Sequence, residues 1–445
     1  MMNTAQNSGS DFVVGLGATG MSIARYLHRK QQQAMFFDTR TEPPGVDELR
    51  ALFPNAQLLL GSVRLPSNID RVIASPGIPD SHPIFEDARL ADVEVVSDIE
   101  LFVREAKAPF LAVTGSNGKS TVTTLLYHMC RAAGREAYAG GNLGEPALDL
   151  LDKPTPDLYV LELSSFHLQR TRNLPAAVSV LLNVTPDHLD WHASPDEYFA
   201  AKYRIFREAK AAVYNRADPA AARAAAGIPR RVSFGEDEPA EGQFGLREDN
   251  GETYLAFGDK LLLGTDELAM YGRHNQLNAL AALAAGSLAG LNLAAMLTVL
   301  CEFPGLSHRM EFVRHFASVD YVNDSKATNV AAAVAAINSV EGSLVLIAGG
   351  DGKGGDFSQL ADALEDKLRA AVLIGKDAQA IADALDTVLP VYFADDMQDA
   401  VIAAESFAEP EDTVLLAPAC ASLDQYKNYM ARGDAFAEAV WELRE

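Results

Sequence analysis

Cysteine and basic side chains are both scarce in this chain of 445 residues. The cysteines are Cys130, Cys301 and Cys420, far apart and without a CxxC pair, which argues against a disulfide framework and against a cysteine-based metal site. Only 37 basic side chains stand against 61 acidic ones, giving a formal net charge of -24. Such a surface repels phosphate backbones, so we expect no nucleic-acid partner, although a few residues can still bind a nucleotide locally.

Export signals and long apolar spans are also missing from the sequence. Residues 1–10 are polar and contain no basic stretch followed by an apolar run, unlike a secretory signal. The most apolar segment, 279–300, is rich in alanine and interrupted by Gly286 and Gly290, which predicts packed helices instead of a membrane span. We therefore expect a cytoplasmic protein that does not insert into membranes. A monomer is a separate expectation that these absences do not establish.

Strand-like apolar runs alternate with helical patterns throughout, which predicts α/β layers. Three regions each begin with a strand and a distinctive loop, at residues 12–20, 110–121 and 321–329. Breaks near residue 97 and at Pro304 separate these regions. We expect three α/β domains, spanning residues 1–97, 98–305 and 306–445.

The first loop is rich in glycine and follows a strand. Gly15, Gly17 and Gly20 match the dinucleotide fingerprint, and Asp38 closes the next strand, where an acid that binds ribose would lie. The glycines allow the backbone to approach a diphosphate at a helix N-terminus. A nicotinamide cofactor, a UDP-linked substrate and a purely structural turn all satisfy this pattern.

A phosphate-binding loop lies between the strand beginning at Phe110 and the following helix. Its backbone N–H groups can surround phosphate oxygens, Lys119 can neutralise them, and the Ser120 hydroxyl can bind magnesium. The loop departs from the common pattern at Val113, where a first glycine would stand. The residues expected to bind ATP here are Gly115, Ser116, Asn117, Gly118, Lys119, Ser120 and Thr121.

Two further candidates for metal binding follow strands. Glu162 ends the apolar run 158–162, where its carboxylate can hold magnesium beside the phosphates or simply point to water. His188 follows the next strand, and both a structural and a functional role remain open for it. His192, four residues later, makes a metal-binding pair conceivable, but the intervening sequence shows no helical pattern.

Lys202 lies on a predicted helix whose N-terminus is capped by Ser194. Helical spacing places Phe199, Lys202 and Phe206 on one face. Burial on such a face lowers the pKa of a lysine, and the neutral amine can react with carbon dioxide to give a carbamate, an anionic metal ligand. The alternative is a lysine whose stem covers apolar surface while its amine reaches water.

Three loops of the last region follow strands, at residues 323–329, 349–353 and 418–422. Parallel sheets of this type bind ligands at the carboxyl ends of their strands. Together the loops gather lysines, hydroxyls and acids suited to a small, anionic, amino-acid-like substrate. Each alone could be a turn.

These motifs together resemble the Mur ligases, and nearly the whole chain takes part in the resemblance. The last-domain motifs are similar to those of the branch that adds D-glutamate. The matching segments are GLGATG at 15–20, DTR at 38–40, SPGI at 75–78, TGSNGKST at 114–121, LELSSF at 161–166, NVTPDHLD at 183–190, AAKYRIF at 200–206, NDSKATN at 323–329, GGDGK at 349–353 and PACASLDQYKNY at 418–429.

The resemblance implies a Rossmann-like N-terminal domain, a P-loop-type ATPase central domain and a Rossmann-like C-terminal domain. It also implies that the first domain binds the UDP end of UDP-N-acetylmuramoyl-L-alanine. The matching substrate positions are Ala18, Thr19, Asp38, Thr39, Arg40, Gly77 and Asn142. Further ATP contacts match Asn275, Arg309 and Asp324, and the D-glutamate pocket matches Lys326, Thr328, Lys353, Ser422 and Tyr429. The magnesium site, expected to hold two ions, matches Ser120, Glu162, His188 and a carbamylated Lys202. Departures are Tyr429, where phenylalanine is common, and His167, where glutamine is familiar.

The expected reaction transfers the γ-phosphoryl group of ATP to the substrate carboxylate, giving an acyl phosphate that the amine of D-glutamate attacks. Lys119, magnesium and the Lys202 carbamate would neutralise charge during the transfer. Closure of the last domain is expected to assemble the site. The alternatives are an oxidoreductase, a non-catalytic nucleotide-dependent module, and a sibling ligase that adds another amino acid.

Overall fold

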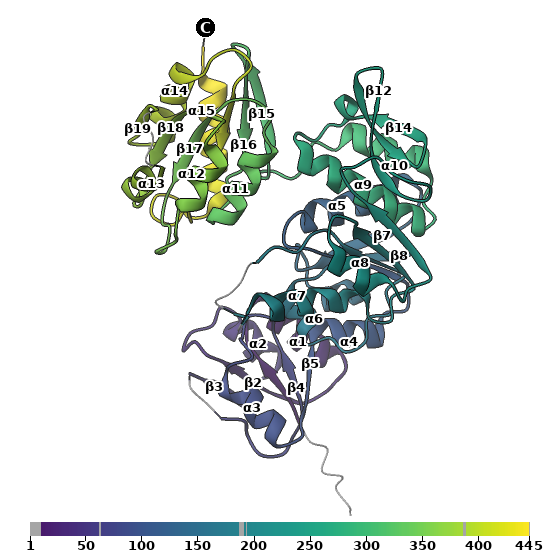
Figure 1. Cartoon of the computed structure of the whole chain (residues 1–445). Helices are drawn as coiled ribbons and strands as arrows, with labels where there is room; N and C mark the ends of the chain where they lie inside the picture. Colours follow the sequence, from purple (N-terminus) through teal and green to yellow (C-terminus); the bar gives the residue numbers. More distant parts are fainter. Residues whose placement is uncertain (1–9, 62–63, 187–190, 193, 386–388, 445) are drawn as a thin grey trace, which may run out of the picture. The chain divides into compact units, whose positions relative to one another are not determined.

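The computed structural model describes residues 10–444 apart from 62–63, 187–190, 193 and 386–388. The chain, whose helices and strands are labelled in Figure 1, divides into two compact units. The first consists of Met1–Arg247, Ala256–Lys260 and Leu280–Val299, and the second of Glu248–Leu255, Leu261–Ala279 and Leu300–Glu445. The first unit therefore contains most of the predicted first and second domains.

The N-terminal sheet has five parallel strands in the order β3-β2-β1-β4-β5. Its strands are β1 Ser10–Val14, β2 Ala34–Asp38, β3 Leu58–Leu60, β4 Ile69–Ala74 and β5 Glu94–Ser97. The helices are α1 Ala18–Arg29, α2 Val46–Leu52, α3 Pro83–Leu90 and α4 Asp98–Glu105. The order of strands reverses beside β1, so the loops after β1 and β4 flank a switch point where such sheets bind ligands.

The middle sheet has nine strands in the order β14-β13-β12-β11-β10-β9-β6-β8-β7. Its strands are β6 Phe110–Thr114, β7 Ala137–Gly141, β8 Leu158–Glu162, β9 Val178–Leu181, β10 Ala211–Asn215, β11 Arg230–Phe234, β12 Phe244–Asp249, β13 Glu252–Phe257 and β14 Lys260–Gly264. The helices are α5 Lys119–Ala132, η1 Ala147–Asp152, α6 Ser165–Gln169, α7 Pro195–Tyr203, η2 Arg204–Phe206, α8 Pro219–Ala225, η3 Thr265–Glu267, α9 Arg273–Leu288 and α10 Leu293–Glu302. Because β6 lies between β8 and β9, the loops after these three strands share one edge.

The C-terminal sheet has six strands in the order β15-β16-β20-β17-β18-β19, all parallel except the β15–β16 pair. Its strands are β15 Glu311–Phe316, β16 Val319–Asn323, β17 Leu344–Gly349, β18 Leu368–Ile374, β19 Val391–Phe393 and β20 Thr413–Leu416. The helices are α11 Val330–Ser339, α12 Ser358–Leu364, α13 Ala378–Leu385, α14 Met397–Phe407 and α15 Tyr429–Glu442.

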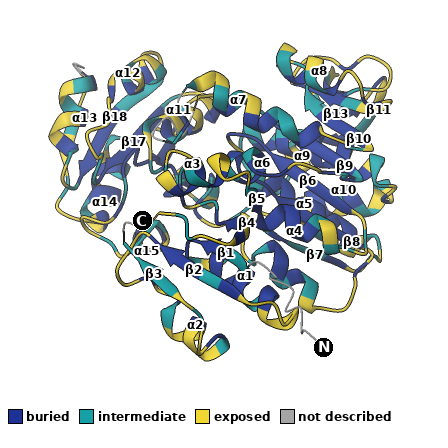
Figure 2. Ribbon diagram, turned by 90° about the horizontal axis from the view of Figure 1, so that it is seen from below, coloured by how far each residue is buried: buried dark blue, intermediate teal, exposed yellow. Residues whose placement is uncertain are grey.

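Helices cover both faces of the C-terminal sheet. Along β17, Leu344 and Leu346 pack in one core cluster with α11, α12 and α13, while Val345 and Ile347 pack in another with α14 and α15. This alternation follows from side chains pointing to opposite faces along a strand. Figure 2 shows β17 buried, as are β6 and β9 in the middle sheet. The predicted α/β architecture is therefore confirmed.

The alanine-rich segment 279–300 forms parts of α9 and α10, as expected. Within the part of the chain that the structure describes, no helix is long and apolar enough to cross a membrane. Residue 97 ends β5, and Pro304 lies between α10 and β15. The domain boundaries themselves stay predictions.

Candidate functional site

The phosphate loop connects β6 to α5, and two of its glycines are required by geometry. Gly118 has a φ of 80° at the start of α5. A Cβ on Gly115 would lie 2.9 Å from the Leu182 Cβ and 3.1 Å from the Asn117 carbonyl oxygen. The loop is also tied to the end of β9, because the Asn117 N–H donates to the Asn183 side chain over 2.8 Å. Its backbone is therefore held by contacts with neighbouring elements.

Both candidate lysines contact this loop at the same atom. Lys119 Nζ donates to the carbonyl oxygens of Gly115 at 2.9 Å and Ser116 at 2.7 Å. Lys202 Nζ donates to the same Gly115 oxygen at 2.7 Å from a different helix. Two lysine amines therefore meet at a loop predicted to bind phosphate.

Lys202 is buried, with only 2% of its surface exposed, so the alternative of an amine in bulk water is wrong. The predicted apolar face was partly wrong as well. The α-helix ends at Tyr203, and Phe206 lies on the following 3₁₀ turn. The aromatic ring beneath the amine belongs to Tyr198, whose centroid lies 4.8 Å from Nζ. Tyr198 also places its hydroxyl 2.8 Å from Ser116 Oγ, linking this ring to the phosphate loop.

Glu162 ends β8 beside β6 and is 2% exposed, so the alternative of an acid pointing at water is wrong. One carboxylate oxygen, Oε1, accepts a hydrogen bond of 2.6 Å from Asn142. The other, Oε2, is buried and has no hydrogen-bond partner among the described residues. A buried carboxylate oxygen without a donor is unfavourable unless something else compensates it. Glu162 and the buried Ser120, on the first turn of α5, are both oxygen ligands of the type magnesium prefers.

His188, the remaining predicted metal ligand, lies outside the described residues. Over the described ranges, no group of three or more His, Cys, Asp or Glu side chains is arranged to hold a metal. His192 is buried, with Nε2 lying 3.0 Å from Ser165 Oγ. His167, at the position where the family motif commonly has glutamine, is part of the capping box of α6 with Ser164.

The loops after β1 and β2 are joined through Asp38. Its carboxylate accepts the Leu16 N–H at 2.7 Å and two guanidinium bonds of 2.8 Å from Arg40. Burial alone would raise the pKa of Asp38, but the hydrogen bonds from Arg40 and Leu16 lower it below its usual value. The acid therefore stays ionised and holds the glycine loop in place.

The loop after β4 packs against the glycine loop. A Cβ on Gly15 would lie 2.9 Å from the Ser75 Cβ. Ala18 and Gly77 are exposed, and Thr39 and Arg40 are exposed after β2. Thr19 lies on the first turn of α1. The structure thus brings the predicted uridine residues to neighbouring loops of one sheet edge, whereas Asn142 lies on the middle sheet beside Glu162.

The predicted D-glutamate residues all belong to the second unit. Lys326 Nζ lies 4.1 Å from the centre of the Tyr429 ring. Ser422 is buried and Thr328 is half-buried, whereas Lys353 is exposed with a φ of 52°. The loops that carry them follow β16, β17 and β20, which are neighbours in the sheet.

The predicted ATP residues Asn275, Arg309 and Asp324 also belong to the second unit, whereas the phosphate loop belongs to the first. Asn275 is buried and its side-chain amide donates to the Tyr271 carbonyl at 2.8 Å. Burial raises the pKa of Asp324 to about 7, although the Met310 N–H and the charge of Arg309 act in the opposite direction. Asp324 is therefore a carboxyl group that titrates near neutral pH.

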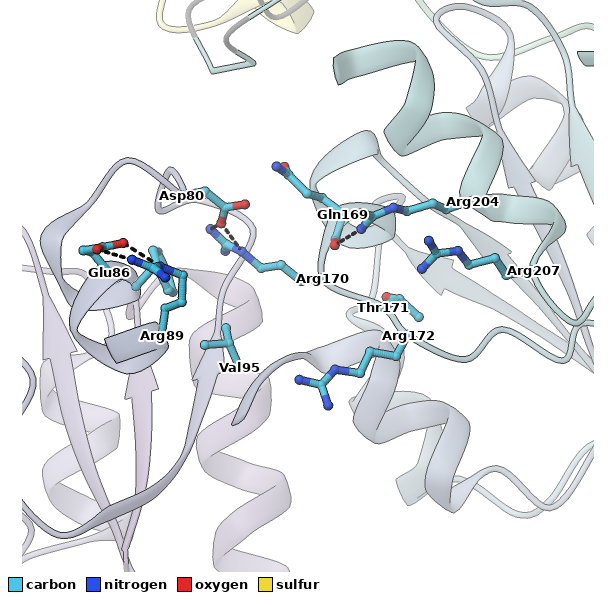
Figure 3. A pocket seen from close by; sticks show the side chains of 11 residues that line it. Asp80, Glu86, Arg89, Val95, Gln169, Arg170, Thr171, Arg172, Arg204 and Arg207 are labelled. Atoms are coloured by element: carbon cyan, nitrogen blue, oxygen red, sulfur yellow. Dashed lines mark hydrogen bonds and ion pairs between the residues drawn. The ribbon is translucent and has the colours of Figure 1, made fainter. Parts of the chain in front are cut away.

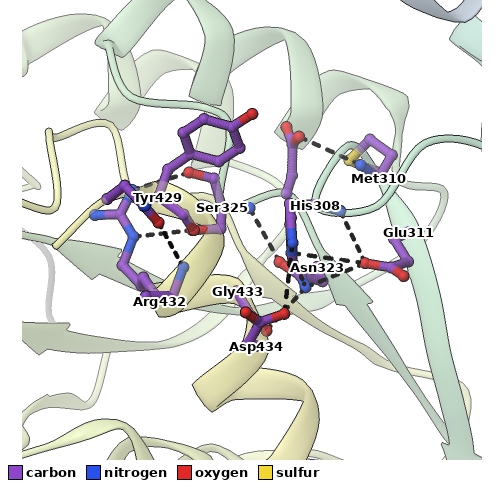
Figure 4. A network of polar contacts seen from close by, with 12 residues as sticks. His308, Met310, Glu311, Asn323, Ser325, Tyr429, Arg432, Gly433 and Asp434 are labelled. Carbon is purple, nitrogen blue, oxygen red and sulfur yellow. Dashed lines mark hydrogen bonds and ion pairs between the residues drawn. The ribbon is translucent and has the colours of Figure 1, made fainter. Parts of the chain in front are cut away.

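Arg432 on α15 has a role that the sequence did not indicate. It is 1% exposed and donates to the carbonyl oxygens of Ser325 at 2.9 Å, Cys420 at 3.1 Å and Gly349 at 3.3 Å (Figure 4). Burial lowers the pKa of its guanidinium to about 10. One side chain therefore joins all three predicted D-glutamate loops. The sequence signal available was only its spacing, three residues after Tyr429 on a helix.

Comparison with known families accounts for nearly the whole chain. The MurD-like N-terminal domain of Mur ligases matches residues 10–97, and the Mur ligase middle domain matches residues 113–286. The glutamate ligase domain of Mur ligases matches residues 308–420. The three matches follow the order of the three sheets.

Curated relatives are similar over their full length. The UDP-N-acetylmuramoylalanine–D-glutamate ligase of Legionella pneumophila (strain Paris) is 46% identical over 443 residues, covering 96% of this chain and 98% of its own. The ligase of the same name from Pseudomonas syringae pv. tomato is 47% identical over 435 residues, covering 96% and 97%.

Solved structures of lower identity share the fold. The MurF ligase from Thermotoga maritima in complex with ADP has a TM-score of 0.61 at 18% identity, covering 98% of this chain and 99% of its own. A pseudomurein peptide ligase type C from Methanothermus fervidus has a TM-score of 0.57 at 19% identity, covering 98% and 100%. With the full-length relatives and the matching order of domains, the chain belongs to the Mur ligase family.

Proposed function

We propose that this protein joins D-glutamate to UDP-N-acetylmuramoyl-L-alanine, consuming ATP and releasing ADP and phosphate, in peptidoglycan precursor synthesis. Full-length similarity to ligases of this name supports the substrates. The observation that carries the chemistry is the convergence of Lys119 and Lys202 on the Gly115 carbonyl, at one sheet edge with Glu162. The proposed setting is the cytoplasm and the proposed active form a monomer of three domains, 1–97, 98–305 and 306–445.

The proposed first step moves the γ-phosphoryl group of ATP to the carboxylate of the UDP-linked substrate, which gives an acyl phosphate and ADP. Lys119 and those loop N–H groups that do not already donate to Asn183 hold and neutralise the phosphates. Because the loop is already braced by Asn183 and Tyr198, little reorganisation is needed at the moment of transfer.

In the second step the amine of D-glutamate attacks the acyl carbon, and phosphate leaves from the tetrahedral intermediate. Lys326, Thr328, Lys353, Ser422 and Tyr429 are proposed to bind D-glutamate. The stacking of Lys326 on Tyr429 supports this role, because the ring orients the ammonium that would meet a substrate carboxylate. The proposed ATP residues Asn275, Arg309 and Asp324 belong to the same unit as this pocket.

Magnesium is proposed to bind through Ser120, Glu162, His188 and a carbamylated Lys202, as two ions. The uncompensated Oε2 of Glu162 supports this assignment. Bound magnesium neutralises phosphate charge and orients the transferred group. Carbamylation joins the Lys202 nitrogen to the carbon of carbon dioxide with loss of one proton. The nitrogen keeps one N–H, which suffices for the bond to Gly115 that the amine now makes.

Release of phosphate from ATP tests the proposed reaction. The purified protein is given UDP-N-acetylmuramoyl-L-alanine and, in parallel, D-glutamate, L-glutamate, L-alanine or diaminopimelate. We expect release with D-glutamate to exceed the others at least about tenfold, as pockets with fixed polar partners discriminate. Equal release with another amino acid would indicate a sibling ligase instead.

Lys202→Ala tests the carbamate. We expect kcat to fall by about 100-fold or more, because one charge-stabilising group is lost, and to recover in part with short carboxylates. The matched control is Lys210→Ala, an exposed lysine eight residues later, which should retain activity. Full activity of Lys202→Ala, or no response to carboxylates, would contradict the role.

A further inference from the structure

Arg170, immediately after α6, carries a guanidinium that is 5% exposed and donates in three directions. It donates to the carbonyl oxygens of Ser75 at 2.9 Å and Ile78 at 2.5 Å, and to Asp80 Oδ1 at 2.8 and 2.5 Å. All three acceptors lie on the loop after β4. Arg170 lies in the connection between β8 and β9 of the middle sheet, whereas its acceptors follow β4 of the N-terminal sheet; both lie within one compact unit.

Aromatic rings hold the same guanidinium in place. Its central carbon lies 4.4 Å from the centre of the Phe85 ring and 5.8 Å from that of Trp191. Burial lowers the pKa of Arg170, and the charge of Asp80 acts in the opposite direction. A planar donor between rings, with fixed acceptors at its edge, has little freedom to move.

Arg170 and Arg172 both line a cavity of about 340 Å³ (Figure 3). The two arginines differ in their contacts. The side chain of Arg172 is 60% exposed and pairs with Glu94 at 3.2 Å, away from the loop after β4. Residues 75–80 are thus held by Arg170 and not by the second arginine.

The loop held in this way carries Gly77 between the two carbonyl acceptors, and its Ser75 packs against Gly15 of the glycine loop. We propose that Arg170 is a positioning residue for the UDP end of the substrate, since it fixes the loop after β4 without touching the ligand. This inference rests on the proposed function, which places uridine diphosphate at these loops. By this inference, a side chain from the region of the middle sheet supports a ligand site on the loops of the N-terminal sheet.

The test uses the full chain with Arg170→Lys, because lysine keeps the charge but cannot reach two carbonyls and a carboxylate at once. Asp80→Asn, at a half-exposed position, weakens the brace while leaving the arginine in place. Arg172→Lys is the matched control, with the same exchange in the same cavity. Binding of UDP alone is measured by calorimetry, together with the KM for each substrate, kcat and the melting temperature.

We expect Arg170→Lys to weaken UDP binding and raise the KM for the UDP-linked substrate about tenfold, with kcat and the KM for ATP changed less than about twofold. Asp80→Asn should act in the same direction by about threefold. Unchanged UDP affinity in the folded variants, or an equal rise in the KM for ATP, would overturn the inference. If the wild type binds UDP but does not turn over D-glutamate, the proposed reaction is contradicted, and the UDP affinities of the variants still decide the role of Arg170. If the wild type does not bind UDP, both the proposed reaction and the role of Arg170 are contradicted.

Discussion

Arg170 and Arg432 are buried arginines in different units, and both hold loops that are proposed to bind substrate. Arg170 has a carboxylate partner, Asp80, whose side chain is 43% exposed. Arg432 is hydrogen-bonded only to carbonyl oxygens and the Ser325 hydroxyl among the described residues. Its guanidinium is therefore stabilised by carbonyl dipoles and one hydroxyl, without a hydrogen-bonded carboxylate in the described part of the chain. The difference teaches that a loop cluster can be organised around one cation without an ion pair, provided that every donor finds an acceptor.

The largest expected effect is that of Arg432→Met on the second unit. Removing the guanidinium leaves buried carbonyls of three loops without donors, so we expect a loss of about 3–5 kcal/mol in unfolding free energy. The chain has two tryptophans, Trp191 in the first unit and Trp441 in the second, so Trp191→Phe leaves a reporter for the second unit alone. Urea unfolding in that background gives the measurement.

The matching change in the first unit, Arg170→Met, should cost less, about 1–3 kcal/mol. Asp80 is half-exposed and can regain water when its partner is lost, whereas the loops around Arg432 cannot. Urea unfolding in a Trp441→Phe background reports this unit through Trp191. An Arg170→Met loss equal to or larger than that of Arg432→Met would break the comparison.

The stability of the second unit should depend on pH through Asp324. The pKa of Asp324 is raised to about 7 in the fold, so the folded state binds its proton more tightly than the unfolded state. The stability that this group contributes is full below its ordinary pKa of 3.8 and is lost as pH rises through about 7. Unfolding of the second unit, followed by Trp441 from pH 4 to 8, should show this decline. Asp324→Asn should flatten it, and an unaltered slope would refute the titration.

The smallest expected effect is that of bound UDP on the unfolding free energy of the first unit. At ten times its dissociation constant, UDP should stabilise the first unit by about 1.4 kcal/mol and leave the second unchanged. The signals of Trp191 and Trp441 distinguish the two transitions. Stabilisation of the second unit by UDP would contradict the proposed location of the uridine site in the first unit.

Much of the fold and part of the site could be predicted because the signals are local. Apolar runs followed by glycine loops predict α/β layers, and the position of Glu162 after such a run places it at the sheet edge. The site prediction failed where helix length mattered. The α-helix ends at Tyr203, so Phe206 lies on the following 3₁₀ turn, and the ring beneath the amine is that of Tyr198.

By itself, the sequence determined the three α/β regions, the phosphate loop and the family, since all of these follow from residues close together in the chain. Only the tertiary structure decided that Lys119 and Lys202 share one carbonyl and that Arg170 and Arg432 are buried. Arginine is usually exposed, and nothing local predicts its burial. The acceptors that stabilise these two lie 90 to 95 residues from Arg170 and 12 to 107 from Arg432, so only folding brings them within reach.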